Sequence, residues 1–321
     1  MKLPLFDAHC DTLSAMLYTN QPMQRNNLHV DLQRGEKYAP WAQFFAIFGQ
    51  IDPMGGAGFC GFQTFPDGRH CFEAQYRLFQ ESLAANRDQM YFCRTASDVE
   101  TAALAGKMAA FLSVEGAELL DCDLGRLDEA YELGVRMVGL TWNAANALSG
   151  TSVEESERGL TELGRKFVRR CEELGVIVDV SHISEPGFWD VAEESTKPFV
   201  ASHSNAYAIY PHSRNLTDAQ FRAIIQADGI AGINLFTMLL GGATIDTVMA
   251  HMEHFLSLGG ERHLAIGADL DGCEELPVGL HGIEDMEKLA ERLLQKNYAE
   301  SLVYDIFYHN LMRVVKTVCV I

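Results

Sequence analysis

Short apolar or β-branched runs alternate with longer amphipathic stretches along almost the whole chain. This alternation is typical of parallel strands that are joined by crossover helices. We expect strands at residues 3–8, 42–48, 109–114, 135–140, 176–180, 198–202, 229–235 and 264–268. Helical periodicity predicts helices at residues 73–93, 124–133, 156–174, 186–194, 218–227, 244–258 and 283–295, with a last helix from residue 298 to about 318.

These strand-and-helix units follow one another without an internal repeat, a low-complexity linker or a shift in composition. The pattern therefore predicts an α/β fold with one domain, a single (β/α)8 TIM barrel that spans residues 1–321. An irregular, glycine-rich insertion is expected after the second strand, at about residues 50–69. It would lie at the carboxyl ends of the strands, where barrels carry their active sites.

The charge of the chain excludes one broad class of function. The 321 residues include 25 Lys and Arg against 44 Asp and Glu, a formal net charge of −19. Such a surface repels nucleic acids and anionic membranes, so we expect neither as a partner. No apolar stretch is long enough to cross a bilayer or resembles a secretion signal, and the cysteines form no CxxC pair. We therefore expect a cytoplasmic protein with reduced, buried thiols.

Polar side chains follow six of the predicted strands, at the end where a barrel places its active site. They are His9 and Asp11 after the first strand, Glu115 after the third, Asn143 after the fourth, His182 after the fifth, His203 after the sixth and Asp269 after the eighth. One polar residue at a strand end is more often a cap than a ligand. Carboxylates and imidazoles buried together would be costly without a cation, so the set predicts a metal site. Imidazole and carboxylate without thiolate favour Zn²⁺, with Mn²⁺, Fe²⁺ or Co²⁺ as substitutes.

Other candidate ligands are weaker. An extended backbone turns Cys10 away from its neighbours His9 and Asp11, so we expect Cys10 to pack rather than to bind metal. Four further histidines follow no predicted strand and are expected at the surface or behind the metal ligands: His212, His251, His254 and His263.

Six segments carry a resemblance to a known family. They are FDAHCDTL, FLSVEGAELL, GLTWNAAN, DVSHIS, ASHSNAYAIYPHSRNLTD and GADLDG, in this order between residues 6 and 272. In these segments the chain resembles the renal, or membrane, dipeptidases, the M19 zinc peptidases within the amidohydrolase-like barrels. An HxD pair alone indicates only the superfamily, whereas SHSNAY followed by SRN is close to diagnostic of this family. The resemblance implies a barrel of the metal-dependent hydrolase type.

The resemblance also implies a cofactor of two zinc ions in each chain. Glu115 would bridge the two ions. His9 and Asp11 would complete the coordination of one ion, and His182 and His203 that of the other. A shared anionic ligand makes physical sense, because it keeps two close cations from repelling each other.

Catalytic and substrate-binding roles follow from the same resemblance. Asp269 would move protons, and Arg214 would bind the terminal carboxylate of the substrate, since a guanidinium can donate two parallel hydrogen bonds to a carboxylate. The sequence departs from the animal enzymes after the fourth strand, where they carry a histidine that polarises the substrate. This chain has Trp142 and then Asn143 there, so Asn143 is expected to donate the hydrogen bond instead.

We therefore expect a cytoplasmic zinc dipeptidase that cleaves short peptides with a free C-terminal carboxylate, by attack of a metal-bridging hydroxide. A dipeptide is the expected partner, and a homodimer is allowed. One alternative is another binuclear amidohydrolase, such as a lactone or cyclic amide hydrolase. The bridging Glu115, with no lysine at the end of the fourth strand, argues against the carbamylated-lysine subclasses. A second alternative is a metal-binding barrel without turnover, against which Asp269 argues.

Overall fold

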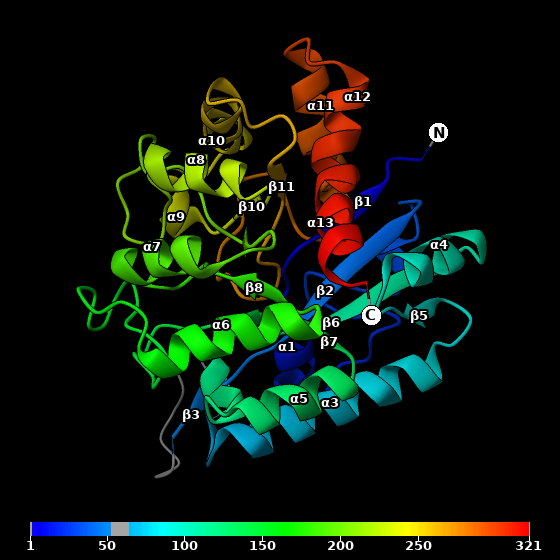
Figure 1. Cartoon of the computed structure of the whole chain (residues 1–321). Coiled ribbons are helices and arrows are strands. Elements are labelled where there is room, and N and C mark those ends of the chain that lie inside the picture. Colours follow the sequence, from blue (N-terminus) through cyan, green and yellow to red (C-terminus); the bar gives the residue numbers. More distant parts are fainter. Residues whose placement is uncertain (1, 53–63, 321) are drawn as a thin grey trace.

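A closed ring of parallel strands occupies the centre of the protein, in a computed structural model that describes residues 2–52 and 64–320 (Figure 1). The strands of the ring are β1 (Leu5–Asp7), β2 (Trp41–Ile47), β6 (Met108–Val114), β7 (Val135–Gly139), β8 (Ile177–Asp179), β9 (Val200–Ala201), β10 (Ile230–Ile233) and β11 (Leu264–Ile266). Pairing of β2 with β6 and of β1 with β11 closes the ring. The eight-stranded barrel predicted from the sequence is confirmed.

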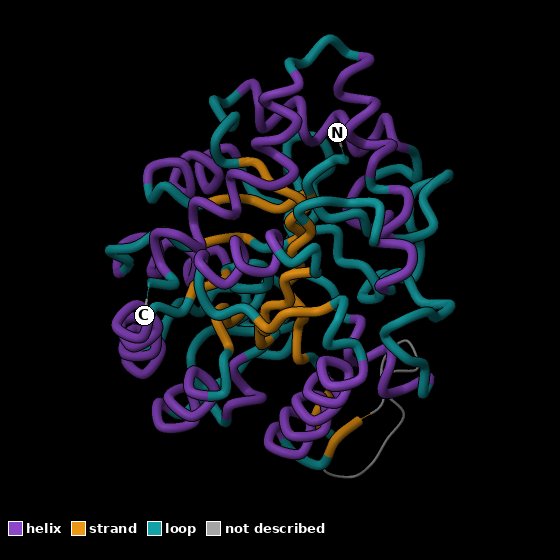
Figure 2. The backbone as a smooth tube through the Cα atoms, turned by 90° about the vertical axis from the view of Figure 1, so that its right-hand side faces the viewer, coloured by secondary structure: helices purple, strands orange, loops and turns teal. Residues whose placement is uncertain are grey.

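Helices surround the strands on all sides (Figure 2). They are α1 (Thr12–Thr19), α2 (Leu32–Gly35), α3 (Gly68–Ala85), α4 (Ala96–Leu104), α5 (Leu124–Glu132), α6 (Glu162–Leu174), α7 (Glu185–Glu194), α8 (Asp218–Gln226), α9 (Thr237–Leu240), α10 (Ile245–Ser257), α11 (Glu287–Gln295), α12 (Glu300–Tyr304) and α13 (Asn310–Val318). Side-chain oxygens cap the amino ends of several of these helices. Thr95 and Thr217 form capping boxes before α4 and α8, and Ser184 accepts from Gly187 at the start of α7.

The inside of the barrel is filled by large aromatic side chains. Phe6, Phe44 and Phe111 are fully buried, and their ring centroids lie 4.8 to 5.7 Å apart. Apolar residues at the beginnings of the other strands join this cluster, together with one face of α13. The barrel is therefore a packed core that α13 covers at its amino end, and its carboxyl end is left for an active site.

Three predicted elements need correction. The helix expected at residues 73–93 ends at Ala85, and Met90–Phe92 form a strand, β5, that pairs with the first half of β6 outside the ring. The helix expected from residue 156 begins at Glu162. The insertion expected at 50–69 is not wholly irregular, because β3 (Gln50–Ile51) pairs with β4 (Thr64–Phe65) and α3 begins at Gly68. Its middle part lies outside the described residues.

The seven cysteines in the described part of the chain are buried, as the sequence predicts. Cys10, Cys71, Cys93, Cys122, Cys171, Cys273 and Cys319 are buried free thiols. Cys10 packs as expected, and its thiol donates to the backbone oxygen of Phe44. Across residues 2–52 and 64–320, no helix combines the length and apolarity that a membrane span requires.

Replacing Phe111 tests the importance of the aromatic core. Phe111→Ala should lower the free energy of unfolding by about 3 to 5 kcal/mol, because the barrel cannot close over the lost ring. Chemical denaturation followed by circular dichroism measures the change. Leu104→Ala is the control, since Leu104 is 92% exposed. Equal small losses in both variants would show that the three rings do not act as a packed core.

Candidate metal centre and active site

Six polar residues from the carboxyl ends of five strands meet in one buried space. His9 and Asp11 follow β1, Glu115 follows β6, His182 follows β8, His203 follows β9 and Asp269 follows β11. Each of these residues is at most 8% exposed. Three overlapping groups among them have ligand atoms within 4.8 Å of one another. The structure thus brings together every residue that the sequence predicted as a metal ligand.

His9, Asp11 and Glu115 form one half of the cluster. The Nε2 atom of His9 lies 3.4 Å from Oδ2 of Asp11 and 3.5 Å from Oε2 of Glu115. His9 Nε2, Asp11 Oδ1 and Glu115 Oε2 are buried and have no hydrogen-bond partner within the described chain. Buried polar atoms without partners are costly, and a cation between them would satisfy all three. This half of the cluster therefore fits a divalent metal ion.

The other half uses the second oxygen of the same carboxylate. Oε1 of Glu115 lies 2.9 Å from Nε2 of His182 and 3.4 Å from Nε2 of His203. Burial lowers the pKa of His182 to about 4 and that of His203 well below its usual range, with the charges of Arg214 and His9 acting in the same direction. Both imidazoles are therefore neutral at neutral pH, which is the form that binds metal. Because one oxygen of Glu115 faces each half, its carboxylate is placed to bridge two ions.

The outer nitrogens of both histidines are held by oxygen atoms. Nδ1 of His182 lies 3.0 Å from Oδ1 of Asn143 and donates to it, since an amide oxygen only accepts. Nδ1 of His203 lies 2.7 Å from Oγ of Ser202, whose hydroxyl in turn donates to the buried carboxylate of Asp179. With the proton on Nδ1, the lone pair of each Nε2 points into the cluster. Asn143, which the sequence predicted to bind substrate, thus holds the ring of His182 in place, a contact that the sequence did not reveal.

Asp269 completes the edge of the cluster. Its Oδ2 accepts from the amide of Asn234 at 2.9 Å, and its Oδ1 lies 3.8 Å from Nε2 of His9. Burial raises its pKa above the ordinary value for an aspartate. One oxygen is therefore fixed and the other faces the candidate metal centre, which suits either proton transfer or an added ligand.

Gly272 allows the two aspartates to approach each other, and sequence analysis did not single it out. A Cβ atom at this position would lie 2.0 Å from Oδ2 of Asp11 and 2.3 Å from Oδ1 of Asp269. These distances are far below any contact distance, so a side chain here would displace both carboxylates. The glycine of the GADLDG segment was the available signal.

Arg214 is a buried cation beside this cluster. Only 7% of Arg214 is exposed, and within the described residues no carboxylate lies within ion-pair distance of its guanidinium. Its nearest contacts are long, 3.5 Å to Oγ of Ser204 and 3.4 Å to the backbone oxygen of His203. Burial lowers its pKa to about 10, so it keeps its charge at neutral pH. Such a group favours an anionic partner from outside the chain.

Arg214 and the ligand cluster open onto one cavity of about 200 Å³. Apolar side chains form much of its wall: Phe48, Trp142, Val153, Phe236, Met238 and Leu239. Trp142 stands where the resemblance implies a histidine in the animal enzymes, and its ring centroid lies 5.0 Å from that of Phe48 and 6.3 Å from that of His182. It therefore supplies an apolar surface beside the candidate metal centre.

Two of the four histidines expected at the surface or behind the metal ligands are buried elsewhere. His263 is 8% exposed, and its Nδ1 lies 2.9 Å from the backbone oxygen of Gly229. His251 is not at the surface but fully buried, where its ring accepts from the backbone of Ala206 and contacts the backbone oxygen of Leu240. His212 lines the cavity with Arg214. Because His212, His251 and His263 do not directly follow a strand, reasoning from strand ends could not place them.

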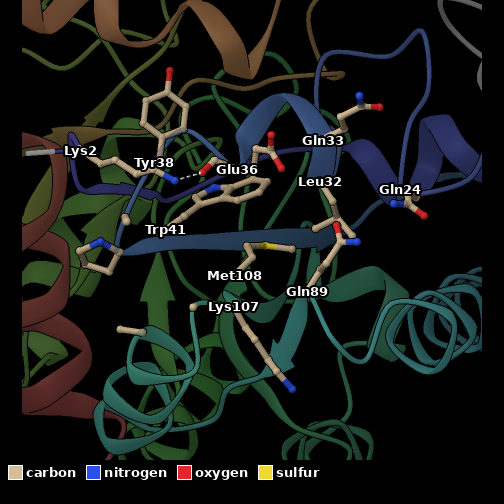
Figure 3. Close-up of a pocket in the computed structure, with 14 residues that line it drawn as sticks. Lys2, Gln24, Leu32, Gln33, Glu36, Tyr38, Trp41, Gln89, Lys107 and Met108 are labelled. Atoms are coloured by element: carbon tan, nitrogen blue, oxygen red, sulfur yellow. Dashed lines mark hydrogen bonds between the residues drawn. The ribbon is translucent and has the colours of Figure 1, made fainter.

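A larger cavity of about 530 Å³ lies at the amino end of the barrel, beside the first residues of β2 and β6 (Figure 3). Its two lysine amines already donate to backbone oxygens, Lys2 to Glu36 and Lys107 to Arg87. Glu36 is its one acidic side chain, and no histidine or cysteine lines it among the residues described. Its chemistry does not suit a metal site, in contrast to the cavity at the carboxyl end.

Comparison with known proteins gives a consistent result. A family model described as membrane dipeptidase, peptidase family M19, matches residues 1–320. Among curated proteins, the dipeptidase tcpJ of Claviceps purpurea is 32% identical over 308 residues, which cover 93% of this chain and 71% of that protein. An uncharacterized dipeptidase of Schizosaccharomyces pombe is 27% identical over 334 residues, 98% of this chain and 80% of that protein.

Solved structures resemble the whole barrel. A metallopeptidase of Rhodobacter sphaeroides, liganded with a phosphinate mimic of the dipeptide L-Ala-D-Ala, matches with a TM-score of 0.87 and 28% identity over 99% of this chain and 100% of that one. The probable dipeptidase PvdM of Pseudomonas aeruginosa matches with a TM-score of 0.89 over 99% of this chain and 96% of that one. At 21% identity, this second likeness shows the fold alone.

Gly272→Ala tests whether the close approach of Asp11 and Asp269 matters for metal binding. We expect affinity for a divalent metal to fall by about 10- to 100-fold, the usual effect of disturbing groups around a metal ligand. Titration of metal-free protein with Zn²⁺ measures this, and Gly125→Ala, where the nearest atom is the Asp123 side chain at 3.1 Å, is the control. Unchanged affinity would mean that the two carboxylates do not hold metal in this arrangement.

Proposed function

The chain belongs to the membrane dipeptidase family, peptidase family M19, and is a metallo-dipeptidase, and we propose that it cleaves dipeptides with a free C-terminal carboxylate at a two-zinc centre. The observation that carries this proposal is the place of Arg214. A buried cation without an ion-pair partner in the described chain shares a cavity with a cluster of metal-ligating side chains. A dipeptide offers a carboxylate to the first and a peptide carbonyl to the second.

The donor set supports zinc as the metal. His9, His182 and His203 supply imidazole nitrogens, and Asp11 and Glu115 supply carboxylate oxygens. This mixture without thiolate suits Zn²⁺. Bound there, two such ions would supply an activated water and polarise the peptide carbonyl.

The side chains of this protein would do the remaining work. Asp269, held at one oxygen by Asn234, would accept a proton from the attacking water and return it to the leaving nitrogen. Arg214 would fix the terminal carboxylate and so align the scissile bond. Asn143 uses its amide oxygen for His182, which leaves its amide N–H groups to donate to the substrate. The metallopeptidase of Rhodobacter sphaeroides, which this chain resembles, was likewise solved with a mimic of a dipeptide.

The alternatives considered from the sequence give way to this assignment. Relatives over most of the chain are named dipeptidases rather than lactone or cyclic amide hydrolases. Membership of an enzyme family also replaces the hypothesis of a metal-binding barrel without turnover.

Glu115→Gln tests the bridge between the ions. We expect the variant to lose activity together with at least one metal ion, because a neutral amide no longer screens two close cations from each other. Elemental analysis of purified protein, next to a peptide hydrolysis assay, measures both. Glu129→Gln, which changes an exposed side chain, should keep its metal. Two metal ions per chain in Glu115→Gln would contradict the bridging role of Glu115.

Arg214 can be tested by a cycle that crosses enzyme variant with substrate. Arg214→Ala should lower kcat/KM by a factor that corresponds to on the order of 3 kcal/mol of transition-state stabilisation, because charge-assisted hydrogen bonds are lost. Arg214→Lys should recover little of this loss. Amidation of the dipeptide C-terminus should harm the wild type by a similar factor but hardly harm Arg214→Ala.

The exposed Arg222 provides the matched control, because Arg222→Ala changes the same residue type outside the cavity. If the losses from Arg214→Ala and from amidation simply add, Arg214 does not contact the terminal carboxylate. The requirement for a free C-terminus would then be wrong.

A further inference from the structure

His212 lies in the loop after β9, two residues before Arg214, and both side chains line the same cavity. The loop is held in place by its own contacts. Asn215 donates to the backbone oxygens of Tyr210 and Leu239 at 2.9 and 2.8 Å, and the amide of Leu216 donates to Asn205 at 2.7 Å. The position of His212 relative to Arg214 is therefore fixed by the loop before any ligand arrives.

The backbone of Arg214 selects the tautomer of His212. The N–H of Arg214 donates to Nδ1 of His212 at 3.1 Å. An imidazole that accepts at Nδ1 carries its proton at Nε2 when it is neutral. Burial, and next the charge of Arg214, lower the pKa of His212 below its ordinary value, so the neutral form predominates at neutral pH. The Tyr210 ring stacks on the imidazole with 6.2 Å between centroids and an interplanar angle of 18°.

This arrangement leaves the Nε2–H of His212, a residue that lines the cavity, available as a donor. No group within residues 2–52 or 64–320 hydrogen-bonds to Nε2. Nε2 has no partner but is not one of the fully buried atoms, so a ligand can reach it. A carboxylate has more lone pairs than the fork of one guanidinium uses. The same anion can therefore accept from Arg214 and from a neighbouring neutral donor.

We propose that His212 is a second substrate-binding residue, which donates from Nε2 to the terminal carboxylate that Arg214 holds. The inference rests on the proposed function, because it requires a substrate with a free carboxylate. It predicts that the site recognises this carboxylate by three hydrogen bonds, of which one comes from an uncharged group. His212 would thus add selectivity for a carboxylate without adding charge to the cavity.

The experiment compares two ligands on zinc-loaded enzyme by isothermal titration calorimetry. One ligand is a phosphinate dipeptide mimic with a free carboxylate, and the other is the same mimic with a C-terminal amide. His212→Ala should weaken binding of the acid by about 10- to 100-fold, the scale of one hydrogen bond to a charged group, and leave binding of the amide unchanged. His212→Gln, which restores an N–H donor of similar reach, should recover most of the affinity.

Controls separate this role from a structural one. His281→Ala, which changes an exposed histidine outside the cavity, should bind both ligands as the wild type does, and metal content and circular dichroism should stay the same in all variants. Equal weakening of acid and amide in His212→Ala would overturn the inference, because the residue would then only support the loop. If the wild type itself binds acid and amide equally, the carboxylate requirement of the proposed function is wrong, and the inference fails with it.

Discussion

Mutual repulsion among buried acidic groups is the constraint on which this protein depends. Asp11, Glu115 and Asp269 lie within one buried space, and the ion pairs that they form in the described chain are with His9, His182 and His203 alone. Packing three carboxylates together without cations is unfavourable, because burial removes the water that would screen them. Two divalent ions would reverse the sign of that interaction. The rest of the barrel holds these carboxylates where such ions could bind between them.

The positioning is achieved by layers of different chemistry. The rings of Phe6, Phe44 and Phe111 fill the inside of the barrel, so the candidate metal-ligating side chains stay at its carboxyl end. Above them, Ser202 links His203 to the buried carboxylate of Asp179 across two strands. Apolar packing thus sets the depth of the site, and directional hydrogen bonds set the orientation of its rings.

The sequence was most informative where the backbone alone decides position. A barrel brings the carboxyl ends of its strands together, so a polar residue after an apolar run, such as Glu115 or His203, could be placed without knowing any contact. The places of Gly272 and His212 beside the cavity could not be predicted, because they depend on the path of loops. The helix predicted to reach residue 93 extended too far for a related reason. Apolar residues such as Met90 continue the helical pattern past the turn that ends α3, and only pairing with β6 shows that they form a strand.

The closure of the ring between its first and last strands has a consequence for synthesis. Asp7 pairs with Ile266, and the backbone N–H of Asp11 donates to the backbone oxygen of Leu270, so segments far apart in the chain lie side by side. During translation the first strand therefore emerges long before its neighbour on one side exists. His9 and Asp11 must wait, with an unpaired strand edge beside them, until the ribosome has delivered the eighth strand. A nascent chain that stops short of β11 therefore carries all five candidate metal ligands, but it lacks Asp269 and the strand that pairs with β1 beside His9 and Asp11.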